Sequence, residues 1–285
     1  MCILYILYIV SRARVGSQEK AIDILEKREY TVLIWAVRPA KESIMANKVL
    51  KIDAHVHSKG ISLCSHLSYQ EIVEEKKKLG YDGIILTNHC QKWYYPPEEH
   101  AAFMEKVIAE YRAAAAYAKT QDFRVWLGLE VSLNEPHYAD WLLYGVTEEF
   151  LRATPCLYQL KQKELFELCE QWGILLVQAH AFRSGHSPCN PKYMHGIEIN
   201  CNGPDINNVP LVEEFAQRHK LLITCGVDYH QVCHNYNGGM FAGEDCNSSV
   251  DFVKEIVKRQ ETHTFYLKID KKYPIYTEKM AFLTK

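Results

Sequence analysis

The chain has 285 residues and a hydrophobic content of 48%, which suits a globular protein of one or two domains with a substantial core. Lys and Arg (33) nearly balance Asp and Glu (35), and there is no basic block, so the formal charge of −2 argues against strong nucleic-acid binding. The 10 cysteines include no C-x-x-C pair, which gives no support to a zinc ribbon and favours a reduced, cytoplasmic protein.

The first 44 residues differ in character from the rest of the chain. Residues 2–10, CILYILYIV, are apolar but much shorter than the roughly 20 residues that span a bilayer, and nothing around them has the pattern of a signal peptide. Met45 stands shortly before the first expected strand. We predict that residues 1–44 are an extension, weakly ordered or peripheral, and that residues 45–285 form one domain. The alternative is a strand and a helix packed outside the main fold.

From Lys48 onward, short apolar runs alternate with helical patterns. Ser68 and Glu71 have the spacing of a capping box, and Gly80 and Gly173 each follow a helical pattern where a C-terminal cap belongs. We expect strands at 49–53, 82–89, 123–131, 141–146, 174–180, 196–200, 221–230 and 264–269. We expect helices at 69–79, 98–119, 157–173, 209–220 and 249–260. This alternation predicts βα units around a mostly parallel sheet, and therefore an α/β fold.

Polar residues gather where the expected strands end. The first strand runs into DAHVHS (53–58), whose alternation places Asp53, His55 and His57 on one side of an extended chain. Further strand ends carry the other members of the set, which are His89, Glu130, His180, Asp228 and His230. In a barrel of parallel strands these ends share one face, so we expect the side chains to converge on one pocket.

Imidazoles and carboxylates in this combination are ligands for divalent transition ions such as Zn, Mn or Fe. The set exceeds what one ion can use, and a carboxylate such as Glu130 can bridge two ions, which suggests a multinuclear site. Clustered ions of this kind hold an anionic oxygen and generate hydroxide near neutral pH. We expect Asp53 to accept a hydrogen bond that fixes the tautomer of a ligand imidazole.

Five motifs in this order, DAHVHS, GIILTNH, GLEV, QAHAFR and GVDYH, resemble those of the PHP (polymerase and histidinol phosphatase) family. The resemblance covers residues 48 to about 235. It implies a distorted (β/α)7 TIM-like barrel in a single domain, with two or three divalent metal ions and phosphoester hydrolysis. The residues that match ligands of the family are His55, His57, His89, Glu130, His180, Asp228 and His230.

The chain departs from the family pattern in three places. A further ligand histidine usually follows the H-x-H pair after a short loop, and His66 is the candidate, although it lies a few residues late. Another ligand usually lies between the positions of Glu130 and His180, where either His137 or Asp140 could serve. The family commonly has Asp before the second-strand histidine, but this chain has Asn88, which should weaken the support of His89.

These observations predict a metal-dependent phosphoesterase that cleaves a small phosphorylated substrate by attack of a metal-bound hydroxide. Arg183 would orient the phosphate with its planar guanidinium, and His230 would protonate the leaving group, as well as being a ligand. The alternatives are an amidohydrolase-type C–N hydrolase, whose barrel also begins with H-x-H, and a catalytically impaired metal-binding PHP domain. We expect no membrane association, and the sequence leaves the oligomeric state open.

Overall fold

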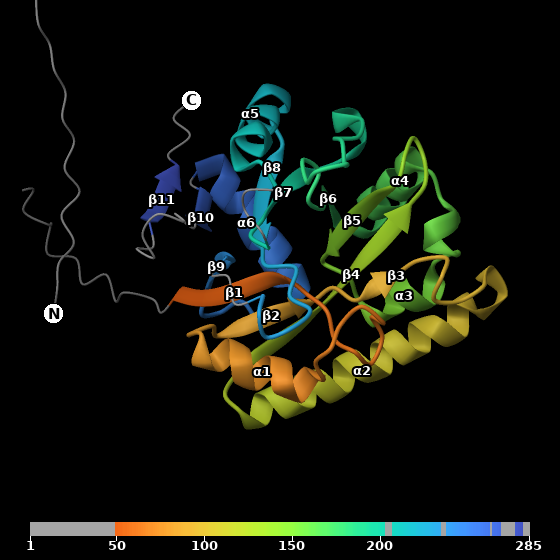
Figure 1. Cartoon of the computed structure of the whole chain (residues 1–285), viewed down its shortest axis with the longest axis vertical. Helices are drawn as coiled ribbons and strands as arrows, with labels where there is room; N and C mark the ends of the chain where they lie inside the picture. The colour runs from red at the N-terminus through yellow and green to blue at the C-terminus, as the bar shows by residue number, and fades with distance from the viewer. Residues whose placement is uncertain (1–48, 203–206, 235–237, 263, 269–276, 282–285) are drawn as a thin grey trace, which may run out of the picture. The chain divides into compact units, whose positions relative to one another are not determined.

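The computed structural model describes residues 49–202, 207–234, 238–262, 264–268 and 277–281, with side chains up to residue 257 (Figure 1). The predicted extension at 1–44 lies outside the described residues. The strands are β1 (Val49–Val56), β2 (Gly83–Leu86), β3 (His89–Cys90), β4 (Arg124–Leu133), β5 (Ala139–Tyr144), β6 (Leu175–Gln178), β7 (Gly196–Asn200), β8 (Leu222–Gly226), β9 (Met240–Gly243), β10 (Thr264–Lys268) and β11 (Thr277–Ala281). The helices are α1 (Tyr69–Lys78), α2 (His100–Thr120), α3 (Glu148–Ala153), α4 (Gln162–Trp172), α5 (Val209–His219) and α6 (Ser249–Thr262), with short 3-10 turns η1 (Pro97–Glu99), η2 (Leu157–Gln159) and η3 (Pro191–Tyr193).

Strands β1, β2, β4, β5, β6, β7 and β8 follow one another around a nearly closed ring. The pairs β1–β2, β2–β4, β6–β7 and β7–β8 are parallel. A parallel bridge between Val56 and Tyr229 joins the two ends of the ring, where the His57 amide also donates to the Tyr229 carbonyl at 3.0 Å. The predicted α/β fold with a TIM-like barrel is confirmed.

The distortion of the barrel lies at β5, which runs antiparallel to both of its neighbours. The chain passes from β4 into β5 without an intervening helix, and in β5 every residue is buried. Because β5 is reversed, the start of this strand lies on the face where its parallel neighbours end. A residue at the beginning of β5 can therefore reach the same pocket as residues at the ends of the other strands.

Three further strands extend the sheet beyond β1. Strand β9 pairs antiparallel with β1, β10 with β9 and β11 with β10. Only β10 was expected from the sequence. Where β9 begins, a Cβ on Gly239 would collide with the carbonyl of Ile52, so the sequence Gly238-Gly239 lets this segment approach β1 closely. Among the described residues, no helix is both long enough and apolar enough to cross a membrane.

Short-range signals mark several of the helix ends. Ser68 and Glu71 form the predicted capping box of α1, and α4 ends at Gly173 with φ +65°. The helix expected at 157–173 begins later, at Gln162, because residues 157–159 form the turn η2. Helices α1 and α2 lie along the outer side of β1, β2 and β4 (Figure 1), and buried residues of both helices join the core with these strands. The strand ends are thereby held in fixed positions.

A buried ion pair also stabilises the barrel. This pair shows that the role predicted for Asp53 was wrong. Asp53 accepts the Val227 amide at 2.9 Å across the closure between β1 and β8. Its other oxygen lies 2.6 Å from the ammonium of Lys76 on α1, and neither side chain is exposed. Lys76 also lies over the ring of Tyr229, 3.8 Å from its centroid. Asp53 therefore joins α1, β1 and β8 instead of holding a ligand imidazole.

Candidate metal centre

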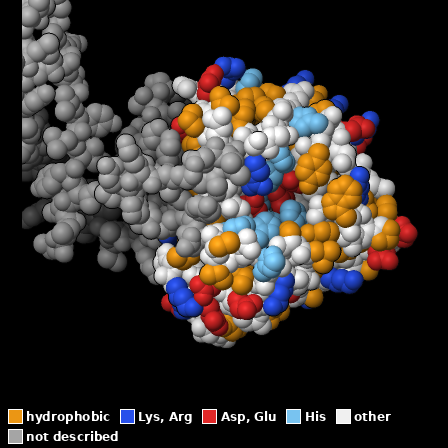
Figure 2. Space-filling model, in the orientation of Figure 1, with side chains coloured by type: hydrophobic (Ala, Val, Ile, Leu, Met, Phe, Trp, Pro, Cys, Tyr) orange, Lys and Arg blue, Asp and Glu red, His pale blue; other side chains and the backbone are white. Residues whose placement is uncertain are grey.

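The predicted ligands converge at one end of the barrel. Histidine side chains surround acidic side chains in a hollow on the face shown in Figure 2. His55 and His57 come from the end of β1, His89 from β3, and Glu130 from β4. His180 follows β6, and both Asp228 and His230 follow β8. The parallel direction of these strands brings together residues that lie up to 175 positions apart in the sequence (55 to 230).

Glu130 lies at the middle of this cluster and is fully buried. Its Oε1 is 3.4 Å from Nε2 of His55 and 3.4 Å from Nε2 of His180. Its Oε2 is 3.3 Å from Nε2 of His57 and 2.9 Å from Nδ1 of His89. Asp228 adds an oxygen that is 3.4 Å from Nε2 of both His55 and His57. Because Nδ1 of His230 also lies 3.3 Å from Oδ1 of Asp228, two carboxylates face five imidazoles.

The donor set fits divalent metal ions better than it fits a packed core. Nε2 of His55, Nε2 of His57 and both oxygens of Glu130 are buried without a hydrogen-bond partner among the described residues. Each such atom costs about 1–3 kcal/mol when it is left unsatisfied. Ligands held about 2.0–2.2 Å from one tetrahedral ion lie about 3.3–3.6 Å apart, and the nitrogen–oxygen distances of 3.3–3.4 Å match this spacing.

Glu198 on β7 fixes the orientation of His55, and the sequence analysis missed it. Its Oε1 lies 2.7 Å from Nδ1 of His55, and its Oε2 accepts the His180 amide at 3.1 Å. A carboxylate only accepts, so Nδ1 of His55 carries a proton that Glu198 holds in place, and Nε2 is the nitrogen turned toward Glu130 and Asp228. The signal was available, because Ile197 and Ile199 pack in the core and alternation sends Glu198 to the barrel interior.

Asn88 fixes the orientation of His57 through a serine. Ser62 donates its hydroxyl to Oδ1 of Asn88 at 2.9 Å, so the Ser62 oxygen is left to accept. It accepts the His89 amide at 3.0 Å and lies 3.3 Å from Nδ1 of His57. Nδ1 of His57 is therefore the protonated nitrogen. Asn88 supports the centre through this loop, so its replacement of the usual Asp does not leave His89 without support.

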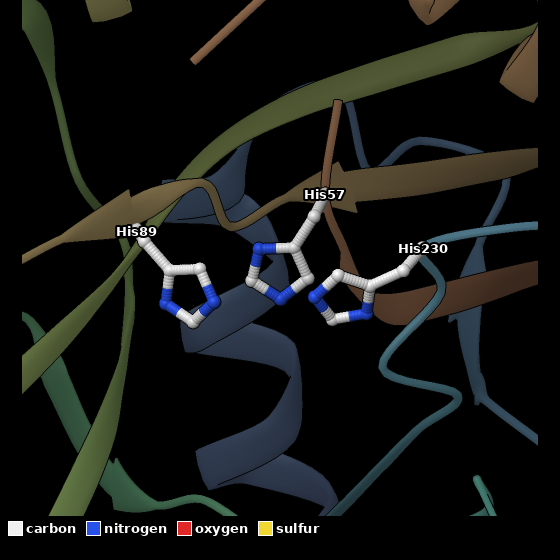
Figure 3. A group of neighbouring side chains, drawn as sticks. All are labelled: His57, His89 and His230. Atoms are coloured by element: carbon white, nitrogen blue, oxygen red, sulfur yellow. The ribbon is translucent and has the colours of Figure 1, made fainter. Parts of the chain in front are cut away.

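His57, His89 and His230 form a compact set that we call the three-imidazole group (Figure 3). The ring of His57 lies between the other two, with centroid distances of 4.4 Å to His89 and 4.3 Å to His230. His230 directs Nδ1 to the carbonyl of Asp228 at 2.8 Å, and His89 directs Nδ1 to Glu130. In each ring Nε2 therefore points toward the other two rings and is free to bind a metal ion.

Two predicted ligands do not join the cluster. His66 is exposed, and its amide, not its ring, approaches the site by donating to the His230 carbonyl. His137 directs Nε2 to the carbonyl of Ser187 at 3.0 Å. Of the two alternatives left open for that region, Asp140 is the one that reaches the cluster, because it is the second residue of the reversed strand β5. It groups with Glu130 and His180, 3.7 Å from Nε2 of the latter.

The backbone is strained at two of these positions. His180 has φ +32° and Asp228 has φ +58°, values that residues other than glycine rarely adopt. Conformations of this kind cost about 1–3 kcal/mol each and persist where the surrounding structure imposes them. Both residues follow the last residue of a strand by two positions, so the sharp bend turns their side chains back over the barrel mouth.

The electrostatics keep the carboxylates anionic. Burial opposes ionisation of Glu130, but the imidazoles of His89 and His55 outweigh it and hold the pKa of Glu130 well below its usual range. Burial likewise opposes ionisation of Asp228, but the positive charge of the His55 imidazole outweighs it and holds the pKa of Asp228 well below the usual value. Burial lowers the pKa of His57 well below 6.5, with further lowering by its imidazole neighbours. Although burial opposes it, the neighbouring carboxylates raise the pKa values of His55 and His89 well above 6.5, so a metal ion that binds the anionic carboxylates must displace protons from these two rings.

A pocket of about 310 Å³ opens onto the cluster. Its walls include Tyr94, Tyr138, Arg183 and His186 besides the candidate ligands. Arg183 donates from Nη2 to Asp228 at 2.6 Å and from Nε to Asn207 at 3.2 Å, so its guanidinium is fixed at the wall. Such a pocket can hold a small anionic molecule beside the candidate metal ligands.

Cys64 lines the pocket near two of the candidate ligands, and the sequence analysis assigned it no role. Burial opposes ionisation of the thiol, but hydrogen bonds with His230 and His89 outweigh it and lower the pKa from 9.0 to about 6. The hydroxyl of Tyr94 donates to the sulfur at 3.6 Å. The side chain is therefore held at the edge of the cluster.

Replacement of Glu198 by glutamine tests how much the orientation of His55 matters. We expect Glu198→Gln to weaken divalent metal binding by about 10–100-fold, because the neutral amide no longer fixes the Nδ1–H tautomer of His55. Isothermal titration with Mn²⁺ and Zn²⁺ measures the change. Glu149→Gln on the exposed side of α3 is the matched control and should bind as the wild type does. Equal affinity of Glu198→Gln and wild type would contradict the role given to Glu198.

No protein-family model matches the chain, and a search of curated proteins finds no match. Among solved structures, the chain is similar to a two-domain protein from Bacteroides vulgatus that contains a predicted PHP-like metal-dependent phosphoesterase, with 18% identity and a TM-score of 0.54. That match covers 77% of this chain and 65% of the other, so this chain spans less than two thirds of that relative.

Two further structures match the chain. PsfC from Pseudomonas syringae is 16% identical with a TM-score of 0.51, and the match covers 75% of this chain and 96% of PsfC. The lesion-specific endonuclease PfuEndoQ from Pyrococcus furiosus is 14% identical with a TM-score of 0.44, covering 79% of this chain and 53% of the endonuclease. Identities this low bear on the fold alone.

Proposed function

We propose, on the premise that this chain shares the barrel fold of PHP-like proteins, that it is a metal-dependent hydrolase of phosphoesters. The resemblance of the five sequence motifs to the PHP family agrees with this fold. The main observation behind the proposal is the set of buried donor atoms around Glu130 that have no hydrogen-bond partner among the described residues. These atoms lie at a small pocket whose wall includes Arg183.

We propose that the ligands are the seven residues predicted from the motifs together with Asp140. Divalent ions bound there would supply hydroxide near neutral pH and offset the negative charge of the phosphate oxygens. Glu130 is the candidate bridge, because its two oxygens face different imidazoles, Oε1 toward His55 and Oε2 toward His57. The number of ions, two or three, and the choice of Zn, Mn or Fe remain part of the proposal.

Arg183 is the candidate phosphate ligand. Its guanidinium has five N–H donors, and its bonds to Asp228 and Asn207 use two of them and orient the group at the pocket wall, so that the remaining donors can reach a bound anion. His230 acts more readily as a ligand than as the predicted proton donor. Its Nε2 lies in the three-imidazole group and its Nδ1 faces a carbonyl, so neither nitrogen is placed to protonate a leaving group.

The size of the pocket and the balanced charge of the chain favour a small phosphorylated substrate. A volume of about 310 Å³ is at the lower end of small-molecule sites. We propose that nucleic acid is not a strong partner, because a duplex ligand is held mainly by clustered basic residues and the chain has no basic block. The cytoplasmic location also remains a prediction.

The proposal is tested by comparing two substrate panels before and after metal removal. We expect purified full-length chain to release phosphate from generic phosphomonoesters, to lose this activity after chelation, and to regain it when Mn²⁺ or Zn²⁺ is restored. Phosphate release and amide or lactone cleavage are measured on the same preparation. Chelator-sensitive cleavage of amides or lactones, without phosphate release, would establish the amidohydrolase alternative. Metal binding without any hydrolysis would establish the catalytically impaired domain.

A further inference from the structure

A series of buried polar side chains leads from His57 toward the outside of the barrel. Ser62 lies 3.3 Å from Nδ1 of His57 and donates its hydroxyl to Oδ1 of Asn88 at 2.9 Å. The same Oδ1 accepts the Ser58 amide at 2.8 Å, and Nδ2 of Asn88 donates to the Ser58 hydroxyl oxygen at 3.1 Å. All four side chains are buried. Hydrogen bonds therefore connect the imidazole with the start of the loop between β1 and α1.

This series of hydrogen bonds ends at Glu110 on α2, the helix that lies along the outer side of the barrel strands (Figure 1). Ser58 donates its hydroxyl to Oε1 of Glu110 at 2.7 Å, and the glutamate side chain is half-buried. The loop backbone lies close to this carboxylate, because a Cβ on Gly60 would collide with it. The glycine thus leaves room for the carboxylate to reach Ser58.

Each of these hydrogen bonds has a direction, and Glu110 sets it. A carboxylate only accepts, so the Ser58 hydroxyl donates to Glu110 and its oxygen must accept from Nδ2 of Asn88. This orientation of the amide turns Oδ1 toward Ser62, whose hydroxyl donates and whose oxygen is left for the Nδ1 proton of His57. Without the carboxylate, the Ser58 hydroxyl can turn to Oδ1 of Asn88, 3.5 Å away, and compete with Ser62 for the same oxygen.

We propose that Glu110 is a positioning residue of the candidate metal centre. It acts through the hydrogen bonds just described and keeps the proton of His57 on Nδ1, so that Nε2 is the nitrogen offered to a metal ion. The carboxylate supplies the negative charge at the end of the series, which the neutral Asn88 and the two serines do not. The inference rests on the metal-dependent function proposed above and extends it to a residue that does not line the pocket.

The tautomer of His57 in the metal-free, full-length chain tests this role directly. Burial lowers the pKa of His57 well below 6.5, so at about pH 8 the ring is neutral and has a defined tautomer. Long-range proton–nitrogen NMR of histidine-labelled protein shows which nitrogen carries the proton, and the spectrum of His57→Gln assigns the signals. We expect the Nδ1–H tautomer in the unmodified chain and a mixture of both tautomers in Glu110→Ala. The control Glu105→Ala removes another carboxylate of α2, which pairs with Arg152, and should keep the Nδ1–H tautomer.

Metal affinity gives a second readout. Glu110→Ala should weaken Mn²⁺ binding by about tenfold, the lower end of what support of a ligand contributes, and isothermal titration measures the change. Gly60→Ala should cause a similar loss, because its Cβ displaces the carboxylate from Ser58. Combined with Glu110→Ala, it should cause no further loss, since the two changes act on the same contact.

A carboxylate at position 88 should make Glu110 dispensable. In Glu110→Ala/Asn88→Asp, one oxygen of the new carboxylate can accept the Ser58 hydroxyl, while the other still accepts the Ser58 amide and the Ser62 hydroxyl. We expect this double variant to recover the Nδ1–H tautomer of His57 and to bind Mn²⁺ within about twofold of the unmodified chain. Such recovery is not expected of a glutamate that only stabilises α2.

The outcomes separate this inference from the proposed function. A Glu110→Ala chain that keeps the Nδ1–H tautomer of His57 would overturn the positioning role and leave the phosphoesterase proposal standing. A chain that binds no divalent ion would overturn the proposed function, and the tautomer of the metal-free protein would still decide the role of Glu110.

Discussion

Glu130→Gln is expected to lower phosphoester hydrolysis by at least about a thousandfold and to abolish tight binding of more than one metal ion. The carboxylate lies within 3.4 Å of four imidazoles, and both of its oxygens are buried without a hydrogen-bond partner among the described residues. An amide offers one neutral oxygen in place of two anionic ones. Loss of about 4 kcal/mol of charge stabilisation corresponds to about a thousandfold in rate.

The measurement combines phosphate release with metal content per chain. Thermal unfolding of the metal-free variant shows whether the barrel is intact, since the predicted loss concerns ion binding and not folding. Glu149→Gln changes the same chemical group at an exposed position of α3 and should retain full activity and metal content. An active Glu130→Gln variant with two or more bound ions would contradict the role that we give to Glu130 as the central metal ligand.

Lys76→Met is expected to destabilise the fold by about 3–5 kcal/mol, because it leaves the buried carboxylate of Asp53 without its partner. The ammonium and the carboxylate lie 2.6 Å apart with no exposure of either side chain. Burial lowers the pKa of Lys76, and Asp53 partly restores it. The same carboxylate accepts the Val227 amide where the barrel closes, so the loss should affect the ends of β1 and β8 together.

Urea unfolding measures this loss as a shift of the midpoint at constant slope. Lys78→Met is the control on the same helix: this lysine is mostly exposed and, among the residues that the structure describes, forms an ion pair with Glu75 alone, so the change should be within about 0.5 kcal/mol. The double variant Lys76→Met/Asp53→Asn removes both charges and keeps an oxygen for the Val227 amide. It should recover at least about 1 kcal/mol relative to Lys76→Met. A loss below about 1 kcal/mol for Lys76→Met would show that the pair does not fasten the barrel.

Much of the site could be predicted because it depends on strand ends. His55 and His57 follow an apolar run with period-two spacing, and His180 and Asp228 each lie two residues beyond the end of a strand, so their convergence follows from the barrel alone. Glu198 was missed because it lies inside the short apolar run GIEIN, where a charged residue has no strand end to mark it. Only its alternation with Ile197 and Ile199 indicates that it faces inward.

The loops could not be predicted in the same way. Choosing between His137 and Asp140 required the direction of β5, and a strand that is buried along its whole length carries no pattern that tells a parallel from an antiparallel neighbour. The turns at residues 58–67 decide that Cys64 faces the pocket while His66 faces solvent, and these turns are set by backbone hydrogen bonds that leave little trace in sequence. Asp53 was misassigned because its partner, Lys76, lies on the charged helix segment EEKKK, which resembles a solvated surface.

The most direct measurement is anomalous diffraction from crystals of the full-length chain grown with Mn²⁺ or Zn²⁺. We predict strong anomalous peaks within coordination distance of both oxygens of Glu130, with His55 and His180 beside one of them and the three-imidazole group beside the other. Peaks only at the protein surface, or none within reach of Glu130 at saturating metal, would contradict the account.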